Sequence, residues 1–266
     1  MLYAAVVPTH LRPTGKNTTE PMQPYLTNDN VSPMSNIPVH LSRVTPRIRV
    51  QWAVQPIIDL DSTVLRGVEL LARNPDCRTA SGTSVVEQLS IDGRYELFRQ
   101  GVQFAQQHAT PTKLYHVNLA AADSFMAHRQ THFENLVIEI TEGTIDSDDL
   151  ESAIKWIQTH GGTVALDDLG ASEWVGDIDA LIALPWDLIK LDRSFLWLDS
   201  SQIEYYKGRL APHFAPLCLE GIERSEDLSI GVHMQATMGQ GYYFGRPWIH
   251  QDTAQYDLSQ YPLTAC

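Results

Sequence analysis

The chain has few cysteines, and it lacks a long apolar run. Its three cysteines, Cys77, Cys218 and Cys266, are odd in number and show no close metal-ligand spacing. They therefore predict reduced thiols in a cytoplasmic protein. No apolar run approaches the ~20 residues that span a bilayer. The short apolar stretch at the start has no basic segment before it and is interrupted by Pro8, so we expect no signal peptide.

Basic residues are also scarce, with 19 Lys and Arg against 32 Asp and Glu and a formal net charge of −13. A general binder of nucleic acid polymers or of membrane surfaces carries a basic face, so both are excluded as expected partners. An anionic small ligand stays compatible with this charge, because bound cations can reverse the sign of a site locally.

Residues 1–47 differ from the rest of the chain in composition and in hydrophobic periodicity. Seven of the 15 prolines fall there, together with many Thr, Asn and Ser residues and no sustained periodicity. The composition predicts an irregular N-terminal arm at 1–47, followed by a folded domain at 48–266. An arm that docks a partner or covers the domain is the alternative.

Short apolar runs alternate with segments of helical period from about residue 48 onward. The predicted strands are Val50–Ile58, Val64–Ala72, Lys113–Leu119, Leu136–Thr141, Thr163–Leu166, Asp187–Leu191, Leu217–Ile222 and Ala236–Phe244. The predicted helices include Tyr95–His108, Asp148–Thr159 and Ser225–His233. This alternation predicts an α/β fold, a (β/α)8 TIM-like barrel. A doubly wound open sheet has the same alternation and stays open as an alternative.

Nearly every predicted strand ends in a carboxylate, an amide or an amine. These residues are Glu69, Asn118, Glu139, Asp167, Asp168, Lys190, Glu220 and Gln240. The carboxyl ends of barrel strands converge on one face, so these side chains would line one pocket. Taken singly, each has an ordinary explanation as a turn, a solvated strand exit or a surface amine. The hypothesis of a functional site depends on their joint placement.

The predicted ligand set consists of oxygen donors, with no His or Cys. Such a set suits Mg²⁺ or Mn²⁺ better than Zn²⁺ or copper. Without metal, so many carboxylates would take up protons through mutual repulsion. The adjacent Asp167 and Asp168 are well placed to bridge two ions, the arrangement used for in-line displacement at phosphorus.

The motifs that contain these residues resemble those of the EAL-domain cyclic di-GMP phosphodiesterases. The similar segments are GVELLAR, with Leu70 where alanine is usual, VNLA, IEITE, ALDDLG, IKLDRSF, LEGIE and GQGYYFGRPW. They follow the family's order over residues 48–249. The resemblance implies a barrel with one antiparallel strand near its start. It also implies hydrolysis of one phosphodiester bond of cyclic di-GMP, which gives linear pGpG.

The resemblance further implies two Mg²⁺ or Mn²⁺ ions per active site and a role for each matching residue. The implied metal ligands are Glu69, Asn118, Glu139, Asp167, Asp168 and Glu220, and Asp167 would bridge the two ions. Catalytic roles fall to Lys190, Glu220, Gln240 and Glu69, and Lys190 would orient the attacking water. Substrate contacts fall to Gln55, Arg73 and Glu223. Glu142 would anchor the loop after the Asp167–Asp168 pair.

Two segments depart from the family pattern. The loop after Asp168 reads LGASEWVG where the family reads FGxGxSS, and the segment TSVVEQLS is short. In the family the first loop shapes the second-metal site and the interface of a homodimer, so the change bears on both. Asn74 stands where an aromatic residue is common. No attached sensor or cyclase domain is recognisable, so we expect regulation through a partner, assembly or expression.

Three alternatives to cyclic di-GMP hydrolysis stay open. The chain could be a receptor that binds the nucleotide without cutting it, although the positions that such relatives lose are filled here. It could be a regulatory domain that binds another protein through the barrel surface. It could also be a metal phosphodiesterase that acts on other nucleotides.

Overall fold

The computed structural model describes residues 49–75, 86, 89–120, 132–141, 147–171, 178–253 and 256–257. The predicted N-terminal arm lies outside the described residues. The described domain begins with the first strand, at Arg49.

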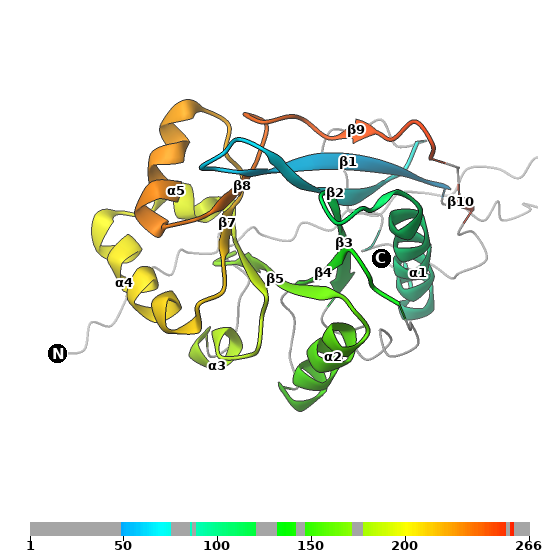
Figure 1. The fold of residues 1–266 in the computed structure, drawn as a ribbon, viewed down its shortest axis with the longest axis horizontal. Coiled ribbons are helices and arrows are strands. Elements are labelled where there is room, and N and C mark those ends of the chain that lie inside the picture. The colour runs from blue at the N-terminus through cyan, green and yellow to red at the C-terminus, as the bar shows by residue number, and fades with distance from the viewer. Residues whose placement is uncertain are drawn as a thin grey trace, which may run out of the picture. The chain divides into compact units, whose positions relative to one another are not determined.

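Eight strands close into a barrel (Figure 1). They are β1 (Arg49–Asp59), β2 (Leu65–Arg73), β3 (Leu114–Ala120), β4 (Leu136–Thr141), β5 (Thr163–Leu169), β6 (Leu188–Leu191), β7 (Leu217–Leu219) and β8 (Met238–Gln240). Neighbours from β2 to β8 run parallel, whereas β1 runs antiparallel to both β2 and β8. The predicted barrel with one antiparallel strand is confirmed, and the open sheet is excluded.

Helices connect the strands and pack outside the barrel (Figure 1). They are α1 (Ile91–His108), α2 (Ser147–Thr159), α3 (Ile178–Ile182), α4 (Ser200–Leu210) and α5 (Leu228–Met234), with 3-10 turns at Arg193–Trp197, Ala211–His213 and Ser225–Asp227. Helix α1 begins before its predicted start at Tyr95, because the Ser90 side chain caps it by accepting from the Gly93 N–H at 3.3 Å. No helix in the described part of the chain is long and apolar enough to cross a membrane.

The free edge of β1 is covered by segments from the end of the chain. Along this edge β1 pairs in turn with β10 (Tyr256–Asp257), β9 (Trp248–Ile249) and β8. The sequence patterns did not predict the two short strands β9 and β10, because two residues are too few to establish a period.

Two strands stop earlier than predicted, and glycines explain why. The predictions Leu217–Ile222 and Ala236–Phe244 were too long, since β7 ends at Leu219 and β8 ends at Gln240. Gly221 has φ of +70° and Gly241 has φ of +153°. A Cβ at Gly241 would collide with the backbone of Ile222. The chain thus turns sharply after Glu220 and after Gln240, which leaves both side chains at the strand ends.

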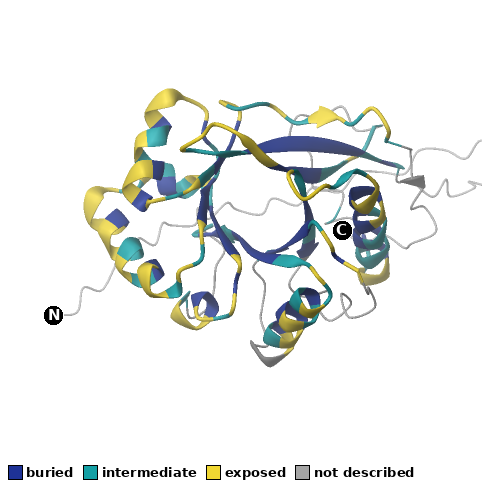
Figure 2. Cartoon of the chain, in the orientation of Figure 1, coloured by how far each residue is buried: buried dark blue, intermediate teal, exposed yellow. Residues whose placement is uncertain are grey.

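The barrel interior is layered, because alternate residues of a strand point to the same face. An apolar layer contains Ile57, Val137, Ala165, Leu188 and Cys218. The residues two positions after the last four are Glu139, Asp167, Lys190 and Glu220. The strands themselves are mostly buried (Figure 2). A polar layer therefore lies directly above an apolar one at the carboxyl ends of the strands.

Candidate active site

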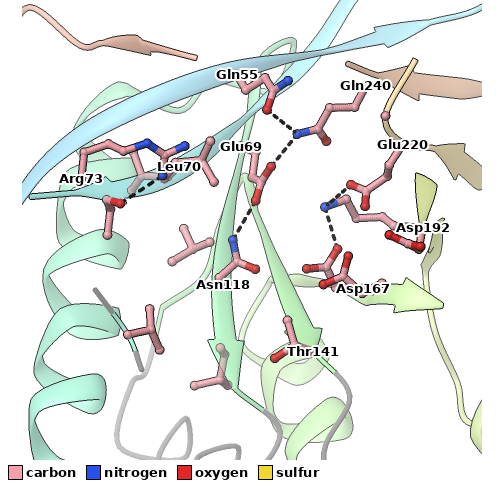
Figure 3. A pocket seen from close by; sticks show the side chains of 18 of the residues that line it. Gln55, Glu69, Leu70, Arg73, Asn118, Thr141, Asp167, Asp192, Glu220 and Gln240 are labelled. Atoms are coloured by element: carbon pink, nitrogen blue, oxygen red, sulfur yellow. Dashed lines mark hydrogen bonds and ion pairs between the residues drawn. The ribbon is translucent and has the colours of Figure 1, made fainter. Parts of the chain in front are cut away.

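A pocket of about 740 Å³ lies at the carboxyl ends of the parallel strands (Figure 3). Ten of the predicted site residues line it, namely Gln55, Glu69, Arg73, Asn118, Asp167, Asp168, Lys190, Glu220, Glu223 and Gln240. Glu139 lies beneath the lining and is fully buried. Glu142, the predicted loop anchor, lies outside the described residues.

Lys190 is the centre of the site. Its Nζ lies 2.7 Å from Asp167 Oδ1, 2.8 Å from Glu139 Oε1 and 2.8 Å from Glu220 Oε1, and its side chain is 1% exposed. Burial alone would lower the pKa of Lys190, but these carboxylates outweigh it and hold that pKa well above its usual value. The lysine therefore stays charged and joins the ends of β4, β5 and β7.

Glu139 has a second buried partner, His116, which the sequence reasoning missed. His116 Nδ1 lies 2.7 Å from Glu139 Oε1. Burial and then the charge of Lys190 lower the pKa of His116 to about 3, so the ring is neutral and donates its Nδ1–H to the carboxylate. The sequence prediction of an all-oxygen ligand set did not include this histidine, which contacts a predicted ligand and does not itself line the pocket. The signal was available, since His116 precedes Asn118 by two positions and so shares its face of β3.

Glu69 is held by amides from two other strands. Asn118 Nδ2 donates to Glu69 Oε1 at 2.9 Å, and Gln240 Nε2 donates to Glu69 Oε2 at 2.5 Å. Gln240 Nε2 also lies 3.4 Å from Gln55 Oε1. Burial raises the pKa of Glu69, but the charge of Lys190 and the two amide hydrogen bonds leave it below its usual value. Glu69 is therefore an ionised carboxylate fixed in orientation.

Asp167, Asp168 and Glu220 form a compact group of oxygen donors. One oxygen from each lies within 4.8 Å of the others. Asp168 has φ of +57°, in the left-handed region. Repulsion from Asp167, followed by burial, raises the pKa of Asp168 to about 7. Burial raises the pKa of Glu220 well above its usual value even with the Lys190 ammonium 2.8 Å away, so divalent cations would compete with protons for these acids.

The described residues fit a site for hard divalent cations. The donors are carboxylate and amide oxygens, which Mg²⁺, Mn²⁺ and Ca²⁺ prefer. Among the described side chains, Glu139 Oε2 is a buried oxygen without a hydrogen-bond partner. Such an oxygen is costly to bury alone, and a cation would satisfy it.

Charged residues that the sequence reasoning did not name also line the pocket. Asp192 follows Lys190 by two positions, and its side chain accepts from the Ser194 N–H at 2.8 Å. Arg94 from α1 and Arg193 lie in the lining as well. Asp192 and Arg193 belong to the segment IKLDRSF, from which the sequence reasoning took Lys190 alone, whereas Arg94 reaches the lining only through the fold.

Fold and site together define a TIM-like barrel protein with an acidic pocket at the carboxyl ends of its strands. The model of the EAL domain family matches residues 47–247, three quarters of the chain, and the chain belongs to this family.

Similar curated proteins carry names that refer to one nucleotide. The chain is 26% identical over 240 residues to the probable cyclic di-GMP phosphodiesterase PdeG of Escherichia coli (strain K12). This match covers 77% of this chain and 46% of that protein. It is 27% identical over 237 residues to the cyclic di-GMP phosphodiesterase RocR of Pseudomonas aeruginosa, covering 76% of this chain and 58% of that protein. The chain thus spans about half the length of these relatives.

Solved structures of EAL domains share the fold. An EAL domain protein from Listeria monocytogenes EGD-e matches with a TM-score of 0.61 and 22% identity, over 75% of this chain and 89% of that chain. The YkuI protein of Bacillus subtilis, with an EAL domain and in complex with c-di-GMP and calcium, matches with a TM-score of 0.62 and 20% identity. That match covers 76% of this chain and 55% of that chain.

Proposed function

We propose that the chain hydrolyses cyclic di-GMP to linear pGpG with two divalent cations, Mg²⁺ or Mn²⁺, bound in the pocket. The observation that carries this proposal is the convergence of five carboxylates and Asn118 around one buried lysine at the strand ends. Membership of the EAL family and the names of the relatives support the choice of substrate.

In this proposal the first cation is held by Glu69, Asn118, Glu139 and Asp167, and the second by Asp167, Asp168 and Glu220. Glu139 would use Oε2, because its Oε1 already contacts Lys190 and His116. Divalent cations in such a site supply Lewis-acid activation of water and stabilise the charge that develops on phosphate oxygens.

The chain's own side chains would position the reactants. Lys190 would orient the attacking water. Because its ammonium contacts three carboxylates, it would have to give up one of these contacts to bind the water. Gln240 would keep Glu69 in place through the hydrogen bond described above. Arg73, exposed at the pocket rim, would contact a substrate phosphate, while Gln55 and Glu223 would contact the nucleotide. A guanidinium and two cations would offset the repulsion between the acidic pocket and a dianionic substrate.

A time course of the purified chain with cyclic di-GMP tests this proposal. We expect pGpG to appear with Mg²⁺ or Mn²⁺ and to be abolished by a chelator. Intact cyclic di-GMP that nevertheless binds in a calorimetric titration would contradict hydrolysis and indicate a receptor. Neither cleavage nor binding would indicate a domain that recognises another protein.

The proposal also covers the cellular compartment and the oligomeric state of the protein. We place it in the cytoplasm, because the sequence lacks a cysteine pairing pattern and the described Cys218 is a buried free thiol. Homodimer formation, which the family resemblance implies, stays a prediction that light scattering can check.

The contribution of Asp168 to the stability of the metal-free protein should decrease as pH rises. The pKa of Asp168 is raised from 3.8 in the unfolded chain to about 7 in the folded chain. Protonated Asp168 therefore contributes fully to the free energy of unfolding below the unfolded pKa of 3.8, and this contribution is lost as pH rises through about 7. Urea unfolding of the unchanged chain and of Asp168→Asn, at about pH 5 and about pH 7.5 in chelator, isolates this contribution, because the lowered pKa of His116 acts in the opposite direction in both. Between these pH values the free energy of unfolding should fall more, or rise less, in the unchanged chain than in Asp168→Asn, and saturating Mg²⁺ should remove this difference between the two. The same pH dependence in both chains without metal would contradict the assignment.

His116 should act as a positioning residue for the first cation. His116→Ala removes the hydrogen bond to Glu139 and should weaken Mg²⁺ binding about 10-fold to 100-fold, as measured by calorimetry. At saturating Mg²⁺, kcat should fall much less than the affinity does. His160→Ala is the matched control, because His160 contacts Trp156 away from the pocket. Unchanged Mg²⁺ affinity in His116→Ala would exclude the positioning role.

A further inference from the structure

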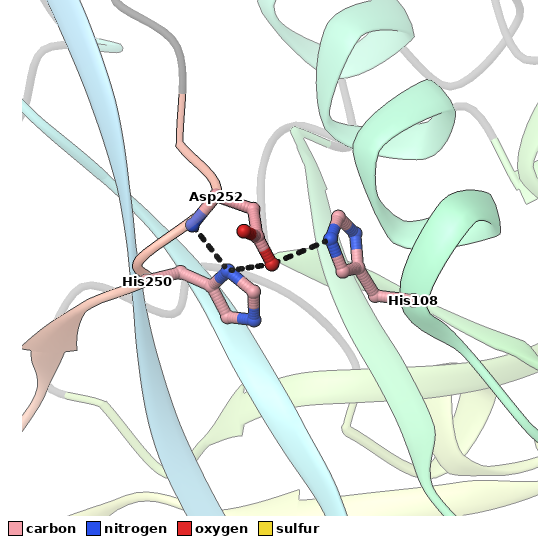
Figure 4. Close-up of side chains that lie close together, drawn as sticks. All are labelled: His108, His250 and Asp252. Atoms are coloured by element: carbon pink, nitrogen blue, oxygen red, sulfur yellow. Dashed lines mark hydrogen bonds and ion pairs between the residues drawn. The ribbon is translucent and has the colours of Figure 1, made fainter.

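A second group of potential ligands, the His108–His250–Asp252 cluster, lies between α1 and the segment after β9 (Figure 4). His108 is the last residue of α1, and the other two residues follow β9 directly. None of the three belongs to the described pocket lining. The cluster therefore needs an explanation separate from the active site.

The distances within the cluster suit a shared cation better than direct hydrogen bonds. Asp252 Oδ2 lies 3.5 Å from His108 Nε2 and 3.8 Å from His250 Nδ1. Good N–H···O hydrogen bonds measure about 2.7–3.2 Å. Two ligands placed about 2.0–2.1 Å from a tetrahedral Zn²⁺ are about 3.3 Å apart. One ligand atom from each residue lies within 4.8 Å of the others, so a small inward movement would complete such a site.

The surrounding contacts orient both rings toward Asp252. His108 Nδ1 donates to the Phe104 carbonyl at 2.8 Å, which leaves Nε2 as the acceptor nitrogen, and the ring stacks on Phe104 at 4.4 Å. His250 Nδ1 faces Asp252, whose N–H donates to it in a long contact of 3.3 Å that a cation at Nδ1 would replace.

The backbone around His250 is already fixed. Its N–H donates to the Trp52 carbonyl at 2.9 Å, and the Trp52 N–H donates to Thr253 Oγ1 at 2.8 Å. Asp252 is more accessible, with 57% of its side chain exposed. The two rings are thus preorganised, while the carboxylate lies on the side from which a cation can enter.

We propose that His108, His250 and Asp252 bind one Zn²⁺ ion, with a water molecule at the fourth position. Two imidazoles and one carboxylate suit Zn²⁺, whereas the all-oxygen pocket suits Mg²⁺ or Mn²⁺. The ion would fasten the segment Trp248–Thr253 to the end of α1, and so hold β9 against β1. Because it binds the folded state, it would also stabilise the chain.

Zinc titration of the full chain in excess Mg²⁺, which keeps the pocket filled, tests the proposal. Calorimetry should show one Zn²⁺ per chain, and Zn²⁺ should raise the Tm. Co²⁺ in its place should give the visible absorption of a tetrahedral site. Asp252→Asn and His250→Ala should each weaken Zn²⁺ binding at least about tenfold. Removing a hydrogen-bond partner of a metal ligand already costs about tenfold or more in affinity, so removing a ligand should cost at least as much.

Two controls separate this site from others. His233→Ala should bind Zn²⁺ like the unchanged chain, because His233 at the end of α5 makes the same ring-to-carbonyl contact, at 2.9 Å, outside the cluster. Asp167→Asn should also retain the Zn²⁺ site. Asp252→Asn replaces an exposed side chain, and circular dichroism checks that it folds. Unchanged Zn²⁺ affinity in both cluster variants, or loss of Zn²⁺ in Asp167→Asn instead, would overturn the proposal.

Discussion

Asp167→Asn should lower kcat/KM for cyclic di-GMP by about 10³-fold, equivalent to about 4 kcal/mol of activation free energy. In the proposed site Asp167 is the only ligand shared by both cations, so its loss disturbs both at once. The variant should still fold, because Lys190 keeps its contacts with Glu139 and Glu220, each at 2.8 Å. Initial rates of pGpG formation at saturating Mg²⁺ measure the effect.

The matched control for this variant is Asp61→Asn. Asp61 is exposed in the turn after β1, so the same chemical change should leave the rate unaltered. Mg²⁺ titrations of both variants would show whether the lost rate accompanies lost metal binding. Undiminished turnover in Asp167→Asn would contradict the proposed ligand set.

Lys190→Met should have a large effect on stability as well as on rate. Removing the ammonium leaves three carboxylates buried without their cation, which should lower the free energy of unfolding of the metal-free chain by about 3–5 kcal/mol. Mg²⁺ should recover much of this loss, because the cations take over the role of counter-charge. Since Lys190 is expected to act on the water and not as a ligand, kcat should remain low even when Mg²⁺ binds. Urea unfolding with and without Mg²⁺ measures the first effect.

Lys155→Met is the control for a lysine in an ordinary ion pair. Its Nζ contacts Glu151 one helical turn away, and both side chains are largely exposed. The expected change is below about 0.5 kcal/mol. If Lys190→Met proved equally mild, or if it abolished Mg²⁺ binding, the distinction between Lys190 and the ligands would be wrong.

Much of the fold could be predicted because strand periodicity and the order of polar strand ends are local features of the sequence. Glu139, Asp167 and Lys190 follow apolar residues by two positions, so strand alternation places them on the inner face of the barrel with those residues. The antiparallel direction of β1 had a different source, since it came from the family resemblance and not from the pattern of its residues.

The remaining features depend on contacts between distant segments. The burial of Glu139 beneath the pocket lining and the His116 contact result from how neighbouring strands are aligned, which periodicity does not report. The early ends of β7 and β8 result from the backbone angles of Gly221 and Gly241. The His108–His250–Asp252 cluster joins residues over 140 positions apart, and their spacing in the sequence carries no signal.

Hydrolysis of cyclic di-GMP in ¹⁸O-labelled water, with Mg²⁺ and mass analysis of the product, tests the central claim most directly. Attack of water on phosphorus at the acidic site predicts linear pGpG with one heavy oxygen in its terminal phosphate. No product should form in chelator, and Asp167→Asn should form product about 10³-fold more slowly than the unchanged chain. Intact cyclic di-GMP after prolonged incubation with Mg²⁺ or Mn²⁺, or cleavage that persists in chelator, would contradict the claim.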